Sequence, residues 1–390
     1  MLYLLPELPA AAQAFLAEWE DLDRNEFEFR TSGTTGPARI VRLSRQQIVH
    51  AAGSSQATMG WAKGQRIGLV LPATGMGGRM GLVRAAVYGM RLVPLSLDLM
   101  NLSNKSYANP ERAPFTDYLD HLSLVPSQAL ALLNHWLAQG TDPGERVGTL
   151  LLGGGPAVSD LLTTLSKAPS KGKPWRVFLG FGMTETAGHF ALRQLFPHPE
   201  TWYTPSPGLE ISLETDLESP QSLPESLPES PTGNLVIRGP VTNQQPLCTR
   251  ERVHLNPDEG TFVWLGRTDL TIQSGGHTLL VDELEAQIRQ NAREYPEFSW
   301  LLSPFWYLAP LQDPFWGEQV AICLPQSLLT TLPKSPLVPS AFAPFLPKAA
   351  YPRYLVVVPE AHFEVPGKIL RLGPEALVAL NPRPLHQIES

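Results

Sequence analysis

Short apolar segments alternate with segments of helical periodicity along this chain, and that alternation limits the possible folds more than any other feature. Residues 67–71, 92–95, 122–125 and 149–152 are apolar runs of strand length, whereas residues 128–137 carry apolar side chains at positions i, i+3 and i+4. Strands that alternate with amphipathic helices are typical of layered α/β folds. The chain has 390 residues, which is enough for more than one domain of this kind.

Charge and cysteine content exclude several classes of protein. The net charge is −7 and the pI is near 5.8, so the basic surface that nucleic acid requires is not predicted. Cys248 and Cys323 are too few for a disulfide framework and fit a reducing compartment. The first residues lack the basic segment of a signal peptide and contain early prolines, so we expect neither a signal peptide nor a membrane span. The sequence therefore predicts a cytoplasmic protein, and it is compatible with a homodimer.

A cluster of small hydroxyl and glycine residues lies near the start of the chain, between two apolar segments. It consists of Thr31, Ser32, Gly33, Thr34, Thr35 and Gly36. Glycine lets backbone N–H groups converge on an anion, and the hydroxyls add further donors, so the cluster predicts a phosphate-binding loop. Proline follows the last glycine, where a Walker A loop needs Lys-Ser/Thr, so that motif is excluded. An exposed polar turn is the alternative interpretation.

Two glycine-containing motifs follow predicted strands. The first is Gly153, Gly154, Gly155 and Pro156, a backbone that can lie flat against a planar ring. The second, residues 180–186, places a carboxylate and two hydroxyls at the carboxyl end of a strand, where open α/β sheets bind ligands.

Two further motifs lie closer to the C-terminus. Arg267 and Asp269 form a charged pair that a glycine pair and an acidic helix start follow, which suggests a pivot between domains. A surface hairpin followed by a helix is the alternative. A Pro-Gly turn presents Lys368, although most lone lysines at turns are simply solvated.

Together these five motifs resemble, in order and spacing, the adenylate-forming superfamily of acyl-CoA synthetases, luciferases and nonribosomal peptide adenylation domains. The matching segments run from Thr31 to Arg371 and so cover nearly the whole chain. These enzymes carry a long segment before the phosphate loop, so the resemblance implies an N-terminally shortened member.

Finer features are similar to the 2-succinylbenzoate-CoA ligases of menaquinone and phylloquinone biosynthesis. They are residues 122–128, residues 248–252, and Ser274-Gly275-Gly276 after the charged pair. The resemblance implies an ATP-dependent acid-CoA ligase. Such an enzyme adenylates a carboxylic acid, here 2-succinylbenzoate, with release of pyrophosphate, and then transfers the acyl group to coenzyme A with release of AMP. The alternatives are an adenylation enzyme that loads a carrier protein, and a non-catalytic remnant that binds a nucleotide or an acyl group.

The resemblance also implies roles for residues on the phosphate side of the nucleotide. The loop at residues 31–36 would hold the β- and γ-phosphates of ATP, and Thr184 would hold the α-phosphate. Glu185 would hold Mg²⁺, which proteins anchor with one or two carboxylates and substrate phosphates. Its alternative is an acidic residue that starts a helix beside Thr184.

On the nucleoside side, adenine would pack against residues 153–156, with Phe181 and Gly182 nearby. Glu251 stands where relatives have the aspartate that binds the ribose, and Arg267 would assist it. Two alternative carboxylates for the ribose follow in the chain, Asp258 and Glu259.

For the domains, the resemblance implies a large N-terminal domain of layered sheets and helices, residues 1–267, and a small mobile α+β C-terminal domain, residues 268–390. Asp269 resembles the hinge between them. Lys368 would bridge the substrate carboxylate and the α-phosphate in the first half-reaction. Rotation would then withdraw Lys368 and bring Ser274, Gly275 and Gly276 to the coenzyme A side.

The acid is less well defined by the sequence. A dicarboxylic aromatic acid needs at least one cation or several donors for its second carboxylate. The candidates in the segments nearest the expected pocket are Arg79, Arg84, His189 and Arg193. A surface charge is the alternative for each.

Overall fold

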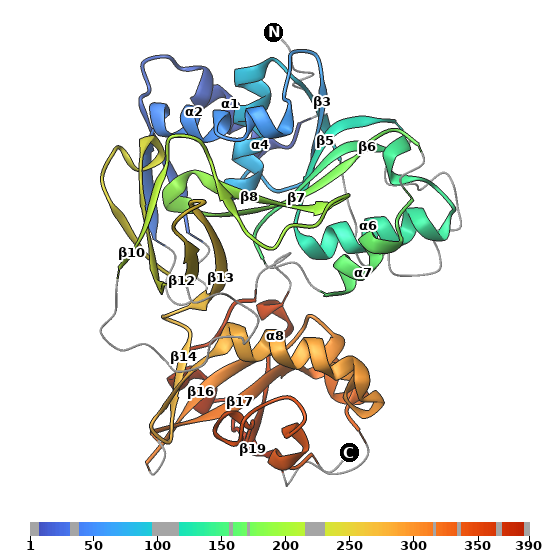
Figure 1. The fold of residues 1–390 in the computed structure, drawn as a ribbon, viewed down its shortest axis with the longest axis vertical. Helices are drawn as coiled ribbons and strands as arrows, with labels where there is room; N and C mark the ends of the chain where they lie inside the picture. The colour runs from blue at the N-terminus through green and yellow to red at the C-terminus, as the bar shows by residue number, and fades with distance from the viewer. Residues whose placement is uncertain are drawn as a thin grey trace.

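The computed structural model describes residues 8–31, 39–95, 117–155, 159–169, 172–214, 231–314, 317–333, 337–363 and 369–385. Figure 1 shows the path of the chain through an upper body, which contains β1 to β13, and a lower body, which contains β14 to β19. The α-helices are α1 (Ala10–Glu20), α2 (Arg45–Gly53), α3 (Gln56–Met59), α4 (Met76–Tyr88), α6 (Pro126–Ala138), α7 (Ser159–Lys167), α8 (Val281–Asn291) and α9 (Pro374–Val378). The 3₁₀ helices are η4 (Pro143–Glu145), η5 (Thr184–Thr186), η6 (Pro240–Thr242), η7 (Ala292–Glu294), η8 (Pro296–Leu302), η9 (Gln326–Thr331), η10 (Pro339–Phe342), η11 (Lys348–Ala350) and η12 (Glu360–His362).

A seven-stranded sheet forms the centre of the upper body. Its strands, in spatial order, are β4 (Arg91–Pro94), β3 (Arg66–Leu69), β5 (Leu119–Leu124), β6 (Val147–Leu152), β7 (Arg176–Met183), β8 (Gly188–Phe196) and β9 (Thr204–Pro205). The strands from β4 to β7 run parallel, and β8 and β9 are antiparallel to their neighbours. The apolar runs of the sequence thus form the parallel part of this sheet.

Helices cover both faces of this sheet, and the sequence alternates accordingly. On β6, Leu150 and Leu152 pack into the core beside α6 and α7, whereas Leu151 packs into the core beside α1, α2 and α4. On β7, Phe178 likewise faces away from its two neighbours in the chain. Successive side chains of a strand point to opposite faces, so a strand that is covered on both sides must be apolar at every position.

Two smaller sheets complete the upper body. The hairpin of β1 (Glu26–Arg30) and β2 (Ile40–Ser44) contributes Phe27 and Phe29 to the first core. The antiparallel strands of the other sheet are β10 (Glu210–Glu214), β11 (Thr232–Arg238), β12 (Leu247–Asn256) and β13 (Thr261–Arg267). Backbone hydrogen bonds of 2.8 and 3.1 Å between Tyr203 and Phe262 join this sheet to the loop before β9.

The lower body is a six-stranded sheet with helices on its faces. Its strands are β14 (Thr271–Ser274), β15 (His277–Leu280), β16 (Tyr307–Asp313), β17 (Gly317–Pro325), β18 (Tyr354–Val358) and β19 (Arg383–Pro384). Leu284 and Ile288 of α8 pack on one side, and Leu377 of α9 packs in a separate cluster. The α/β fold with a second α+β part is the architecture that the sequence predicts.

The chain passes from one hydrophobic core to the other between Trp264 and Leu270. Trp264 packs with the upper body, and Leu270 packs with the lower one. The predicted boundary after Arg267 lies in this interval. Whether the two parts move as separate domains stays a prediction. An ion pair between Arg293 and Asp160 joins the 3₁₀ turn after α8 to α7, and the Arg293 guanidinium also donates to Thr163 at 3.2 Å.

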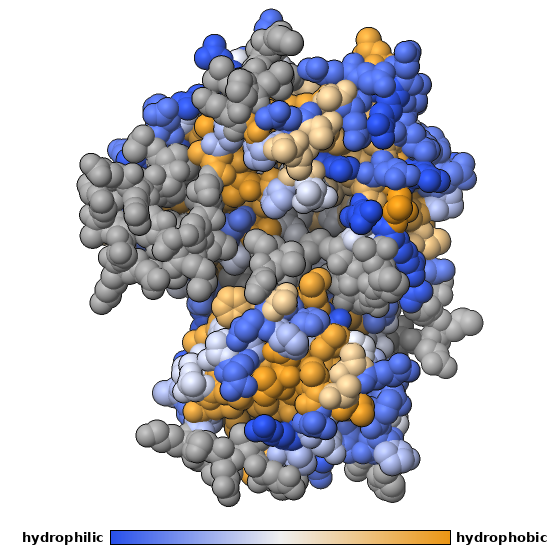
Figure 2. All heavy atoms as spheres, turned by 180° about the vertical axis from the view of Figure 1, so that it is seen from behind, coloured by the Kyte–Doolittle hydropathy of each residue, from blue (hydrophilic) through white to orange (hydrophobic). Residues whose placement is uncertain are grey.

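Seen from behind, hydrophobic residues gather on the lower body and hydrophilic residues surround them (Figure 2). Large parts of any folded protein surface are apolar, so this area alone predicts no partner. None of the helices in the described part of the chain has the length and apolar character needed to cross a membrane.

Helix α4 offers a matched pair of glycines for testing how this helix packs against the preceding segment. A Cβ at Gly78 would lie 2.2 Å from the carbonyl oxygen of Pro72, whereas a Cβ at Gly81 would meet only a leucine methyl at 3.8 Å. We expect Gly78→Ala to lower the free energy of unfolding by about 1–3 kcal/mol, because backbone atoms must move. Gly81→Ala should raise it by about 0.5–1 kcal/mol through helix propensity. Urea unfolding followed by circular dichroism measures both, and equal midpoints for the two variants would contradict this packing.

Candidate functional site

Two of the predicted motifs meet at the carboxyl ends of neighbouring parallel strands. Gly153 and Gly154 follow β6, and residues 180–183 end β7, with Leu152 paired to Leu179. Gly182 is required here, because a Cβ on it would lie 2.0 Å from the carbonyl oxygen of Gly188 on β8. This is the sheet edge at which open α/β folds bind ligands.

The ends of the predicted phosphate loop come together in the β1–β2 hairpin. The Thr31 N–H donates to the Arg39 carbonyl at 2.8 Å, and the Arg39 N–H donates to the Thr31 hydroxyl at 2.9 Å. Strand β2 contacts the 3₁₀ turn η5, which carries Thr184 and Glu185. The base of the loop therefore lies beside the second glycine motif. Several predicted site residues lie outside the described residues, namely Ser32, Gly33, Thr34, Thr35, Gly36, Pro156 and Lys368.

Turn η5 holds Glu185 beside the end of β7. The Thr186 hydroxyl is buried and accepts a hydrogen bond of 3.1 Å from the Met183 N–H, which fixes the turn. Among the described residues, no group lies within hydrogen-bond or ion-pair distance of the Glu185 carboxylate, and no cluster of three metal-ligating side chains occurs. A single carboxylate of this kind fits Mg²⁺ that arrives with nucleotide phosphates, since Mg²⁺ rarely depends on an all-protein cage.

An aromatic cluster connects this turn to the four-stranded sheet. The ring of Phe181 lies 5.2 Å from those of Tyr203 and Phe262 and 6.4 Å from that of Trp264, measured between ring centroids. Trp264 in turn donates its indole N–H to the Glu251 carboxylate at 2.7 Å. Trp264 thus connects Phe181, in the glycine motif of β7, with Glu251, the predicted ribose-binding residue.

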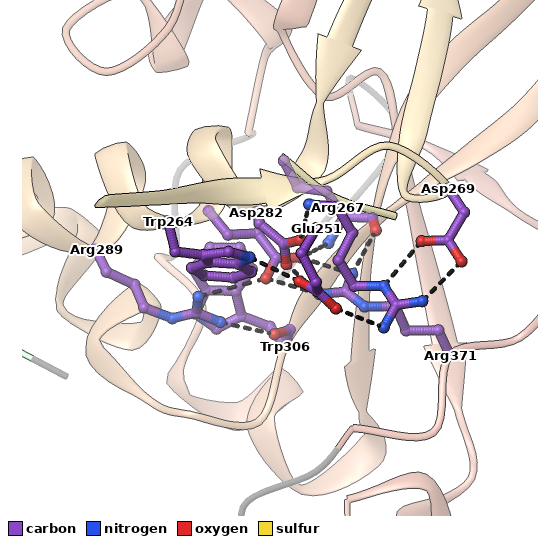
Figure 3. A network of polar contacts seen from close by, with 10 residues as sticks. Glu251, Trp264, Arg267, Asp269, Asp282, Arg289, Trp306 and Arg371 are labelled. Carbon is purple, nitrogen blue, oxygen red and sulfur yellow. Dashed lines mark hydrogen bonds and ion pairs between the residues drawn. The ribbon is translucent and has the colours of Figure 1, made fainter. Parts of the chain in front are cut away.

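Glu251, Arg267 and Asp269 form one network (Figure 3). Arg267 binds Asp269 with two hydrogen bonds of 2.8 Å each and reaches Glu251 with another at 3.2 Å. Strand pairing sets up this contact, because Glu251 on β12 lies directly opposite Arg267 on β13.

Burial and ion pairing shift the acidity of this network in opposite directions. Burial raises the pKa of Glu251 in spite of the nearby Arg267 and Trp264. Burial also acts on Asp269, but the two hydrogen bonds and the charge of Arg267 outweigh it, and the pKa of Asp269 is lowered. The hydrogen bonds to Asp269 raise the pKa of Arg267 above its usual value, so this guanidinium stays charged.

The alternative ribose partners lie elsewhere. Asp258 and Glu259 are exposed in the turn that joins β12 to β13, where both backbone N–H groups bond to the Asn256 side chain. Glu251 and Arg267 pair at the opposite end of the same two strands. Only Glu251 of the three is therefore next to Arg267.

Three further charged residues belong to this network, and the sequence analysis placed them in its motifs without giving them a role. Asp282 at the start of α8 accepts from the Arg267 backbone N–H at 3.1 Å and lies 3.9 Å from the Arg371 guanidinium. Arg371 donates to both oxygens of Glu285, at 2.7 and 2.9 Å. The charges of Arg371 and Arg289 outweigh the effect of burial, and the pKa of Glu285 is lowered. The available signal was the i, i+3 spacing of the two acids and a lone arginine three residues after Lys368.

The predicted coenzyme A loop forms a hairpin turn. Gly275 and Gly276 join β14 to β15 with φ angles of 58° and 80°, values that favour glycine. Ser274 precedes them and is buried. The local structure is the hairpin followed by helix α8, so it agrees with the simpler of the two interpretations, and the roles of this loop and of Asp269 as a hinge stay predictions.

Of the four cations considered for the acid pocket, two stabilise local structure. Arg79 donates to the carbonyls of Ala73 and Glu28, at 2.9 and 2.7 Å, and stacks on Phe15. Arg193 lies over the ring of Tyr203, 5.0 Å from its centroid.

The other two meet inside the upper body. Arg84 on α4 is 3% exposed, and its terminal nitrogen lies 3.2 Å from Nδ1 of His189 on β8. No carboxylate among the described residues lies within ion-pair distance of Arg84, and its Nε has no hydrogen-bond partner there. His189 pairs with Gly182 across the β7–β8 ladder. Arg84, which contacts His189, therefore lies close to the second glycine motif.

The curated proteins that are similar to this chain in sequence share one name. A 2-succinylbenzoate–CoA ligase of Bacillus mycoides is 31% identical over 176 residues, which cover 45% of this chain and 34% of that enzyme. The enzyme of the same name from Bacillus velezensis is 29% identical over 160 residues, or 40% of this chain and 29% of its own. The aligned segments thus span about a third of these curated relatives.

Solved structures are similar over more of the chain. An o-succinylbenzoate coenzyme A synthetase from Bacillus subtilis, in complex with ATP and magnesium, superposes with a TM-score of 0.61 at 21% identity, over 85% of this chain and 66% of that one. An acyl-CoA synthetase (AMP-forming)/AMP-acid ligase II-like protein from Dyadobacter fermentans gives a TM-score of 0.53 at 23% identity, over 90% of this chain and 88% of that one. These similarities establish the fold. The model of the AMP-binding enzyme family matches residues 26–244, more than half of the chain, and the chain therefore belongs to that family.

Proposed function

We propose that this chain is an ATP-dependent acid-CoA ligase that adenylates 2-succinylbenzoate or a closely related aromatic dicarboxylic acid. One observation carries the proposal: Glu251, Arg267 and Asp269 form a charged network that Trp264 and Phe181 connect to the carboxyl edge of the parallel sheet. Membership of the AMP-binding family and the names of the curated relatives support the reaction class.

The chemistry has two steps. A carboxylate oxygen of the acid attacks the α-phosphorus of ATP, the bond to pyrophosphate breaks, and an acyl-adenylate forms. The thiol of coenzyme A then attacks the acyl carbon, the bond to the AMP oxygen breaks, and the thiol proton is released. Neither step needs a protein nucleophile, so the protein contributes positioning and opposing charge. Mg²⁺, when bound with ATP through Glu185, would neutralise phosphate charge.

Glu251 is the proposed acceptor for the ribose hydroxyls. Its side chain is 12% exposed, and Trp264 and Arg267 each occupy one acceptor position on the carboxylate. A carboxylate offers about four such positions, so room for hydroxyl donors remains. Thr31, Thr184 and the loop at residues 31–36 are the proposed phosphate contacts, and residues 153–156 with Phe181 and Gly182 the adenine contacts.

Arg84 supports the choice of a dicarboxylic acid. A buried guanidinium without a carboxylate partner is costly, because burial disfavours an isolated charge. Burial lowers the pKa of Arg84 only to about 10, so it remains a cation near neutral pH. A second carboxylate on the substrate would supply the missing counter-charge through bidentate hydrogen bonds. Of the four candidate cations, Arg84 is the one we assign to this role.

The direct test is pyrophosphate release with a panel of carboxylic acids. We expect release with 2-succinylbenzoate, and AMP and a thioester when coenzyme A is added. Lys368→Ala should abolish pyrophosphate release but keep thioester formation from supplied acyl-adenylate, because the lysine serves only the first step. Turnover with fatty or amino acids but not with 2-succinylbenzoate would overturn the proposed substrate, and full first-step activity of Lys368→Ala would overturn the role of the lysine.

A matched pair of variants tests the ribose contact. Glu251→Ala should raise the KM for ATP by about tenfold, since a hydrogen bond to a charged group contributes about 1.5 kcal/mol or more. Glu259→Ala, in the exposed turn at the other end of the same strands, should leave it unchanged. Steady-state pyrophosphate release at saturating acid measures both values. The reverse result would move the ribose site to the β12–β13 turn.

A further inference from the structure

Three residues from separate segments of the upper body meet at one point. Arg84 lies on α4, His189 on β8, and Ser55 directly before α3. The Ser55 hydroxyl is in close contact with Nε2 of His189, and Nδ1 of the same imidazole faces the Arg84 guanidinium at 3.2 Å. Ser55 is 1% exposed. The three side chains therefore form a hydrogen-bonded chain inside the upper body.

The direction of this chain follows from the chemistry of its ends. A guanidinium has only donors, so the Nδ1 atom that faces Arg84 must be the acceptor. The neutral imidazole then carries its proton on Nε2 and donates to the Ser55 oxygen. Burial and the charge of Arg84 both lower the pKa of His189 well below its usual value, which keeps the ring neutral. His189 consequently acts as an acceptor for Arg84, and it does not supply a second positive charge to an anion.

Two contacts hold the Arg84 guanidinium, and its Nε–H donor remains unpaired among the described residues. Its guanidinium lies over the ring of Trp61, 5.0 Å from the centroid, and one terminal nitrogen bonds to His189. The Nε–H has no partner among the described residues, and the group is almost completely buried. A stacked face and one fixed donor together leave the guanidinium little rotational freedom, so the direction of its remaining donors is set.

We propose that His189 and Ser55 are positioning residues, which orient the Arg84 guanidinium so that its unpaired Nε–H receives the second carboxylate of a dicarboxylic acid substrate. This inference rests on the proposed function and deepens it. It assigns selectivity between dicarboxylic and monocarboxylic acids to the Ser55–His189–Arg84 chain rather than to Arg84 alone. Arg79 and Arg193, which the sequence made equal candidates, have no part in it.

The test compares two acids that differ only in the second carboxylate. One is 2-succinylbenzoate, and the other is 4-oxo-4-phenylbutanoate, which lacks the ring carboxylate. His189→Leu removes the acceptor and should raise the KM for the dicarboxylic acid by about tenfold, as expected for the loss of one charge-assisted hydrogen bond. The KM for the monocarboxylic acid, the KM for ATP and the kcat should stay within about twofold, because the loss concerns ground-state binding of one group.

Rescue and control variants separate positioning from general packing. His189→Asn places an amide oxygen near the former Nδ1 and should restore most of the selectivity. Ser55→Ala should give a smaller change in the same direction, and it keeps the test available if His189→Leu does not fold. His198→Gln, in the exposed turn after β8, serves as the control and should change nothing.

The outcomes separate the positioning role of His189 and Ser55 from the proposed ligase activity. Equal KM increases for both acids, or none for either, would overturn the positioning role while the proposed ligase activity stands. A wild-type protein that releases no pyrophosphate with any acid would overturn the proposed function, and the inference with it.

Discussion

The Arg267 guanidinium is the group on which the arrangement of the site depends. It binds Asp269 through two hydrogen bonds and Glu251 through a third. The backbone N–H of the same residue donates to Asp282 at the start of α8. The last strand of the upper body is thereby fixed to the first helix of the lower one. Planar, bidentate contacts of this kind suit arginine and would not survive replacement by lysine.

A second cation, Arg84, differs from Arg371 in how its charge is balanced. Arg84 is buried without a carboxylate partner among the described residues, in contrast to Arg371, whose charge Glu285 neutralises at 2.7 Å. Arg84 is 3% exposed and the Arg371 side chain is 14% exposed, yet within the described residues only Arg371 has a counter-ion. The difference fits a structural role for Arg371 and a substrate-binding role for Arg84, because a protein tolerates an unpaired buried charge mainly where function requires it.

Local patterns in the sequence predicted the parts of this structure that depend on neighbouring residues. Apolar runs located β3, β5 and β6, and periodicity located α6 (Pro126–Ala138). Contacts between distant residues were beyond such patterns: Arg371 and Glu285 are 86 positions apart, and Arg84 and His189 are 105 apart. The register of β12 and β13 is also a tertiary property, and it separates Glu251 from Asp258 and Glu259.

The central claim is that the acid is activated as an adenylate. The most direct measurement uses acid labelled with ¹⁸O in its carboxylate, with analysis of the AMP that forms in the presence of coenzyme A. Attack of the carboxylate on the α-phosphorus, followed by cleavage of the bond between the acyl carbon and oxygen, leaves one labelled oxygen on AMP. We expect AMP to carry that label. Unlabelled AMP, or label recovered in inorganic phosphate with ADP as the nucleotide product, would contradict the account.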